Sequence, residues 1–123
     1  VEPLGFTLDD KSLKRAKLDY FSNINPIIHK NIYDCFNLLG VNNLNIITKF
    51  GRKYYDQAKF SQDSVLLFGS EIKGLPHSIL KKYYNNTFKI PMIKNSRSLN
   101  LSNAVSIIAF EAWKQLKFSG ISS

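Results

Sequence analysis

The sequence predicts an α/β fold in which a mostly parallel sheet carries helices on both faces. Short apolar segments at residues 44–48, 65–68 and 87–90 alternate with segments of helical periodicity. Strands that are apolar throughout are typical of parallel sheets, because helices cover both faces of such sheets. A length of 123 residues is close to that of one common domain. We therefore expect residues 1–123 to form a single domain.

The first helices are predicted from their end signals. Asp9 or Asp10 can cap a short basic helix at residues 11–17, because an aspartate side chain accepts hydrogen bonds from first-turn N–H groups. A second helix is predicted over residues 26–39, with Pro26 in its first turn and Gly40 as its stop. Cys35 lies on the apolar face of this helix and is expected to be a buried core residue.

Two further helices are predicted in the second half of the chain. Pro76 begins a helix at residues 76–84, whereas residues 49–64 are too irregular to assign. The last helix spans residues 101–117 and has Asn100 or Ser102 as its N-cap. Apolar side chains cover most of its circumference, so we expect it to be buried on more than one side, in the core or against a partner subunit.

The composition narrows the class of function. Seventeen basic and nine acidic residues give a net charge of +8 and a pI near 9.7, which favours a polyanionic partner such as nucleic acid. A single cysteine excludes an internal disulfide and fits a reducing, cytoplasmic location. No apolar run approaches the ~18 residues of a membrane span. His29 and His77 have no neighbours at metal-ligand spacing, so no metal is predicted.

A glycine pair follows the strand at residues 65–68. Gly69 and Gly74 stand at the carboxyl end of this strand, where open α/β sheets usually bind ligands and where glycine lets the backbone approach the ligand closely. The sequence lacks GxGxxG and GxxxxGK[ST], which excludes the usual nucleotide-binding loops. The alternative is that both glycines serve only a turn and that Glu71 is solvated.

A polar segment at residues 94–100 precedes the last helix. Hydroxyl, amide and guanidinium groups before a helix N-terminus can bind a phosphate or ribose through their donors and the helix dipole. The alternative is that Asn100 and Ser102 act only as helix caps.

Together these segments resemble a known family. FGSEIKGLP resembles the second motif, and IPMIKNSRSLNLSNAVSIIAFEAW the third motif, of the SpoU branch of the SPOUT (α/β-knot) methyltransferases. EPLGFTLDDKSLKRAKLDY resembles the matching segment of the tRNA 2′-O-methyltransferases that modify the wobble cytidine or uridine. The resemblance spans residues 2–116 and implies a parallel sheet whose C-terminal segment forms a trefoil knot, an exception to the rule that chains do not thread loops.

The resemblance implies that S-adenosylmethionine is the cofactor and that a ribose 2′-hydroxyl is the methyl acceptor. Backbone recognition of the cofactor would explain Gly69 and Gly74, since a side chain at either position would occupy the cofactor's space. The implied cofactor-binding residues come from three loops and are Ile47, Thr48, Gly69, Gly74, Leu75, Ile90, Met92, Ser98 and Leu99.

The implied catalytic residues are Glu71, Ser98 and Asn100. In the family, an arginine in a first motif, roughly NxGNIxR, helps to activate the hydroxyl. This motif, with its strand and helix, is missing here, so we interpret the domain as N-terminally truncated. We expect an unfilled place near the centre of the sheet and weakened or absent methyl transfer by this chain alone. The alternatives are a non-catalytic cofactor- or RNA-binding module and a 2′-O-methyltransferase of another RNA position.

The resemblance also implies partners. Contacts to tRNA phosphates are expected from Lys14, Arg15, Lys94 and Arg97, although scattered lysines on solvated surfaces are the alternative. A homodimer is expected through the last helix, with Ile108, Phe110 and Trp113 as candidate interface residues. The alternative is that this helix is buried within one monomer.

Overall fold

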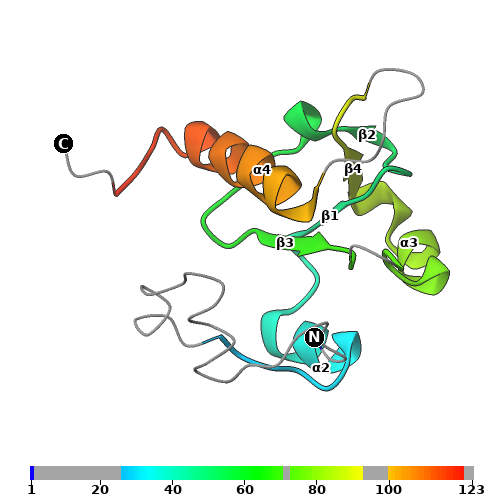
Figure 1. Cartoon of the computed structure of the whole chain (residues 1–123). Coiled ribbons are helices and arrows are strands. Elements are labelled where there is room, and N and C mark those ends of the chain that lie inside the picture. Colours follow the sequence, from blue (N-terminus) through cyan, green and yellow to red (C-terminus); the bar gives the residue numbers. More distant parts are fainter. Residues whose placement is uncertain (2–25, 71–72, 93–99, 121–123) are drawn as a thin grey trace, which may run out of the picture. The chain divides into compact units, whose positions relative to one another are not determined.

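The computed structural model describes residues 1, 26–70, 73–92 and 100–120 (Figure 1). The chain divides into two compact units, residues 1–40 and residues 41–123. The predicted helix at residues 11–17 lies outside the described residues. No helix in the described ranges is long and apolar enough to span a membrane.

The first unit contains helix α2 (Ile32–Leu39). The predicted start of this helix at Pro26 is wrong, because the side chain of Asn31 caps the helix by accepting a 2.9 Å hydrogen bond from the backbone N–H of Asp34. Gly40 ends it as predicted, with a φ of 75° that glycine adopts without strain. Cys35 is half-buried, so its predicted place in a fully buried core is wrong.

The second unit is built on a four-stranded sheet with the order β2-β4-β1-β3. The strands are β1 (Leu44–Ile47), β2 (Lys53–Tyr54), β3 (Val65–Phe68) and β4 (Thr87–Lys89). Every pairing is parallel, which confirms the predicted sheet. The expectation of an unfilled place near its centre is wrong for the described strands. β1 pairs directly with both β3 and β4, and β3 forms one edge.

Both faces of the sheet are covered. All four residues of β1 are buried, and because successive side chains of a strand point to opposite faces, neither face of β1 is open to water. Figure 1 shows α4 (Leu101–Gln115) and α3 (His77–Lys82) on opposite sides of the sheet. There are also two short 3₁₀ helices: η2 (Tyr55–Gln57) follows β2, and η3 (Tyr84–Asn86) precedes β4. The helices predicted at residues 76–84 and 101–117 therefore exist, with slightly shorter bounds.

Helix α4 is held by apolar packing against the sheet and by two hydrogen bonds to the loop between η2 and β3. Ile108 is 0% exposed and belongs to a core cluster that also contains Ile47, Ala58, Phe60 and Phe88. The Gln115 side chain accepts a 2.9 Å hydrogen bond from the N–H of Phe60, and it donates one of 2.9 Å to the carbonyl of Ala58. The prediction that Ile108 belongs to a subunit interface is therefore wrong, because its side chain is buried in the core of the monomer.

The connection between β1 and β2 passes closely across β4. β4 lies between these two strands, so residues 48–52 must cross it. The Thr48 N–H donates to the carbonyl of Phe88 (2.9 Å), and the Arg52 N–H donates to Oγ1 of the buried Thr87 (3.0 Å). A methyl group on Gly51 would overlap the backbone of Phe88. The close crossing therefore requires glycine at this position.

The predicted trefoil knot depends on the path from β4 to α4. Residues 93–99 of this path lie outside the described residues. The knot accordingly stays a prediction, while the parallel sheet that would carry it is confirmed.

The crossing at Gly51 gives the first testable prediction. Replacing Gly51 with alanine should lower the free energy of unfolding by about 1–3 kcal/mol, because an extra carbon in a packed site forces the backbone to shift. Urea unfolding followed by circular dichroism measures this loss. The exposed Lys59→Ala variant should be nearly unchanged, and equal stability of the two variants would contradict the crossing geometry.

Candidate active site

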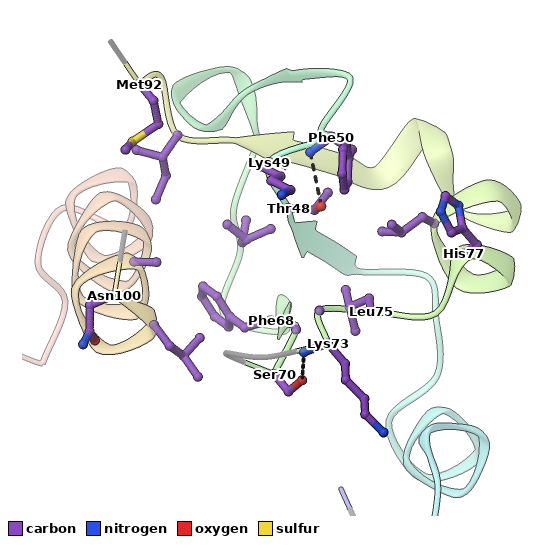
Figure 2. A pocket seen from close by; sticks show the side chains of 17 residues that line it. Thr48, Lys49, Phe50, Phe68, Ser70, Lys73, Leu75, His77, Met92 and Asn100 are labelled. Atoms are coloured by element: carbon purple, nitrogen blue, oxygen red, sulfur yellow. Dashed lines mark hydrogen bonds between the residues drawn. The ribbon is translucent and has the colours of Figure 1, made fainter. Parts of the chain in front are cut away.

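A pocket of about 540 Å³ lies at the carboxyl ends of β4, β1 and β3 (Figure 2). Ile47 ends β1, Phe68 ends β3, Ile90 follows β4, and all three line the pocket. In the sheet, β2 lies on one side of β1 and β3 lies on the other side. The direction in which the chain adds strands therefore reverses at β1. Such a switch point is where open α/β sheets bind their ligands, and the volume is in the range of small-molecule sites.

The first wall of the pocket is the loop that follows β3. The Gly74 N–H donates a 3.0 Å hydrogen bond to the carbonyl of Ser70. The Lys73 N–H donates one of 3.1 Å to Oγ of Ser70 (Figure 2). A Cβ on Gly69 would lie 2.7 Å from Cα of Gly74. Gly69 is therefore required by the loop's own backbone. Its predicted role in leaving space for the cofactor stays a prediction.

Gly74 is required for a different reason. Its φ of 65° lies in the left-handed region that strains other residues, whereas a Cβ there would meet no atom within 4 Å. The glycine pair thus sets a tight turn between the strand and α3, with open space beside Gly74.

The second wall is the segment after β1. Oγ1 of Thr48 accepts a 3.2 Å hydrogen bond from the N–H of Phe50, which fixes the turn (Figure 2). Lys49 and Phe50 line the pocket from this turn and are exposed. The turn is held against β4 by the Thr48–Phe88 hydrogen bond, so the wall depends on the same crossing as Gly51.

The third wall is the first turn of α4. Oδ1 of Asn100 accepts hydrogen bonds from the N–H of Ser102 (2.8 Å) and from its hydroxyl (2.7 Å). Asn100 is therefore the N-cap, as predicted, and it also lines the pocket. Figure 2 shows Asn100 and Met92 on one side of the pocket and Leu75 and His77 on the other. The helix dipole places partial positive charge at this wall.

The structure brings together all the described residues that the sequence predicts for the site. Those that line the pocket are Ile47, Thr48, Gly69, Gly74, Leu75, Ile90, Met92 and Asn100. The other predicted residues lie outside the described ranges and are Lys14, Arg15, Glu71, Lys94, Arg97, Ser98 and Leu99.

Several pocket residues were missed by sequence reasoning. His77 was considered only as a metal ligand and rejected, yet it is exposed and lines the pocket from the start of α3. Phe68 was treated only as a strand residue, although its position at a strand's carboxyl end was the available signal. The others follow predicted residues or belong to adjoining helices and are Lys49, Phe50, Leu80, Leu101 and Ala104. Ser70 and Lys73 also line the pocket, within the predicted loop from Gly69 to Leu75.

Residues 1–110 match the family described as the SpoU rRNA Methylase family. The chain belongs to this family. A tRNA (cytidine(34)-2'-O)-methyltransferase from Saccharophagus degradans is 43% identical over 122 residues, which cover 98% of this chain and 79% of the relative. The predicted family is confirmed, and this relative is longer than the chain.

Solved structures of SpoU methyltransferases share the fold. One, which concerns 2-OH methylation of C/U34 on tRNA, is 36% identical with a TM-score of 0.82 and covers 94% of this chain and 76% of that chain. An rRNA methyltransferase from Sinorhizobium meliloti with bound AdoMet is 29% identical with a TM-score of 0.70, and covers 91% of this chain and 44% of that one. The predicted α/β fold of the SpoU methyltransferases is thereby confirmed.

The cap at Asn100 gives the second prediction. Asn100→Ala should lower the free energy of unfolding by about 0.5–2 kcal/mol, because the N–H of Ser102 loses its acceptor. Asn100→Asp should keep the native stability, since a carboxylate accepts the same hydrogen bond and interacts favourably with the helix N-terminus. Thermal unfolding at neutral pH measures both variants.

The matched control for this cap is Asn103→Ala, an exposed substitution on the same helix that removes no hydrogen bond described for the cap. It should change stability by less than about 0.5 kcal/mol. Equal losses in the alanine and aspartate variants at position 100 would show that capping is not the role of this side chain.

Proposed function

We propose that this chain is a methyltransferase that uses S-adenosylmethionine to methylate the 2′-hydroxyl of the tRNA wobble nucleotide, position 34. The observation that carries the proposal is the pocket, which unites three separate loops at a sheet switch point. Similar proteins named tRNA (cytidine(34)-2'-O)-methyltransferase support the proposal that tRNA is the substrate and that nucleotide 34 is the modified position. Because these relatives are longer than the chain, methyl transfer by the 123 residues alone is also part of the proposal.

The residues present fit the cofactor. Apolar side chains from Ile47, Phe68 and Ile90 provide a wall for a flat ring, while the turns at Thr48 and Gly69 bring polar backbone into the same pocket. When bound, S-adenosylmethionine supplies an electrophilic methyl group on a sulfonium. We assign its binding to the three loops, through the residues Ile47, Thr48, Gly69, Gly74, Leu75, Ile90, Met92, Ser98 and Leu99.

The chain's contribution to the reaction is the positioning of the reacting groups. Helix α4 carries Asn100 at the pocket wall, and the rigid cap restricts the movement of its carboxamide. We assign Glu71 and Ser98, with Asn100, to the organisation of the ribose. None of Arg15, Arg52 and Arg97 has the first-motif context, so no base is assigned among them.

We assign tRNA binding to Lys14, Arg15, Lys94 and Arg97. We also propose that residues 1–123 form a single domain and that the protein is located in the cytoplasm.

We further propose a homodimer through α4. Phe110 is 62% exposed, and its ring lies 5.9 Å from that of Trp113, which in turn lies 5.0 Å from that of Phe118. Such an exposed aromatic group is typical of an interface.

Two measurements test the function. Isothermal titration measures binding of S-adenosylmethionine, and transfer of a labelled methyl group is measured on an anticodon stem-loop RNA. Weak methylation is expected on this RNA, because the first-motif arginine is missing from this sequence, and it should be abolished when nucleotide 34 carries a 2′-deoxyribose. Cofactor binding without incorporation would instead favour a non-catalytic module. Incorporation that survives the 2′-deoxy change would place the reaction at another position.

The turn at Gly69 gives a further prediction. Gly69→Ala should weaken S-adenosylmethionine binding by roughly tenfold or more, because the new carbon displaces the Gly74 backbone that forms a pocket wall. Titration calorimetry measures the dissociation constant. Gly40→Ala, a substitution outside the pocket lining, serves as the control and should leave the affinity within about twofold, and a normal affinity in Gly69→Ala would contradict the assigned site.

A further inference from the structure

A group of basic and aromatic side chains, all exposed except the half-buried Lys89, lies beside the pocket, on β2, β4 and the turn that follows β1. We call this group the basic–aromatic platform, and it consists of Lys49, Phe50, Arg52, Lys53, Tyr54 and Lys89. We propose that the platform stacks the unpaired RNA nucleotides next to the methylated one and so positions the RNA over the pocket. The inference rests on the proposed function and adds an RNA-binding surface to the residues assigned above.

The aromatic members of the platform are unusually open. Phe50 is 62% exposed and Tyr54 is 48% exposed. Neither ring belongs to the core cluster around Ile108, so packing of this core does not explain why large aromatic side chains stand at these two positions. Exposed aromatic faces bind single-stranded nucleic acid because every base offers a flat surface on which to stack.

Each aromatic ring has a lysine above it. Nζ of Lys49 lies 5.1 Å from the centroid of the Phe50 ring, and Nζ of Lys89 lies 5.2 Å from that of Tyr54. Tyr54 and Lys89 are direct partners in the pairing of β2 with β4, so the backbone fixes this second pair. The arrangement places a cation beside each stacking surface, where a nucleotide carries its phosphate.

Among the residues that the structure describes, no acidic side chain forms an ion pair with a cation of the platform. Its four cations are Lys49, Arg52, Lys53 and Lys89, and the nearest acidic residue in the sequence is Asp56 in η2. Within the described ranges, the ion pair found joins Lys114 to Glu111 on α4 and involves no platform residue. An uncompensated positive surface favours the phosphates of a nucleic acid over a neutral partner.

The platform is continuous with the pocket. Lys49 and Phe50 belong to both, and Figure 2 shows them at one side of the cavity. Lys89 ends β4, and the next residue, Ile90, lines the pocket. Nucleotides stacked on the platform therefore lead directly to the place where the target ribose is proposed to lie.

Tyr84 supplies a matched control. It is 50% exposed, almost the same as Tyr54, but it belongs to η3, which precedes β4. The pocket lies at the opposite, carboxyl end of that strand. Replacing Tyr84 with leucine therefore removes an equally exposed ring away from the proposed RNA path.

The experiment compares Tyr54→Leu, Tyr54→Phe and Tyr84→Leu in the full chain. The probe is an anticodon stem-loop RNA with 2-aminopurine in the loop, and its affinity is measured by fluorescence anisotropy. Tyr54→Leu should weaken binding by roughly 5- to 150-fold, the usual effect of losing one stacked base. Tyr54→Phe keeps the ring and should stay within about twofold of the native protein, as should Tyr84→Leu.

Fluorescence of the 2-aminopurine provides a second readout, since stacking on an aromatic ring quenches it. The quenching should be retained in Tyr54→Phe and lost in Tyr54→Leu. Unchanged affinity and quenching in Tyr54→Leu would overturn the platform, as would equal losses in Tyr54→Leu and Tyr84→Leu, or no RNA binding by the native chain.

These outcomes are separate from those that test the proposed function. Cofactor binding and methyl transfer are measured on the same preparations without reference to Tyr54. RNA binding that depends on Tyr54 without methyl transfer would support the platform and contradict the enzyme. Methyl transfer with RNA binding insensitive to Tyr54 would support the enzyme and overturn the platform.

Discussion

The burial of Ile108 against the ends of β1 and β4 is the contact on which the rest of the second unit depends. Removing such a side chain from water contributes about 1.5–3 kcal/mol, and the two hydrogen bonds of Gln115 fix the far end of the same helix. The first turn of α4 is thereby held over the sheet edge, where Asn100, Leu101 and Ala104 form a wall of the pocket. Packing at the middle of the helix and hydrogen bonding at its C-terminal end thus position the wall of the site at its N-terminal end.

The position of β4 between β1 and β2 has a comparable effect. It forces residues 48–52 to cross β4, and the cost of this crossing is reduced by Gly51 and by Thr87. Thr87 donates to the carbonyl of Tyr84 and accepts from the N–H of Arg52, so its buried hydroxyl is fully paired. The same crossing carries Lys49 and Phe50 to the pocket and begins the basic–aromatic platform. Structural and ligand-facing roles therefore share one short segment.

Local signals allowed much of the site to be predicted. The strand at Val65–Phe68 and the cap at Asn100 have short-range causes, namely apolar continuity and a side-chain acceptor before a helix. Failures occurred where a distant contact decided the outcome. Ile108 was an interface candidate because its helix is apolar on several sides, and only the packed sheet determined which side is buried. The backbone constraint on Gly69 was also missed, since it comes from Gly74, which is its neighbour in space.

The sequence by itself determined the class of fold, the family and the segments that meet at the pocket, because parallel strands bring their carboxyl ends to one edge whatever their order. Tertiary structure alone decided that order, the need for glycine at Gly51 and the exposure of Phe50 and Tyr54. Strand order follows from contacts between residues far apart in the chain, which periodicity and end signals do not encode. The identity of an aromatic residue likewise does not show whether its side chain is buried in a core or exposed on a surface. Only the packed structure distinguishes these two cases.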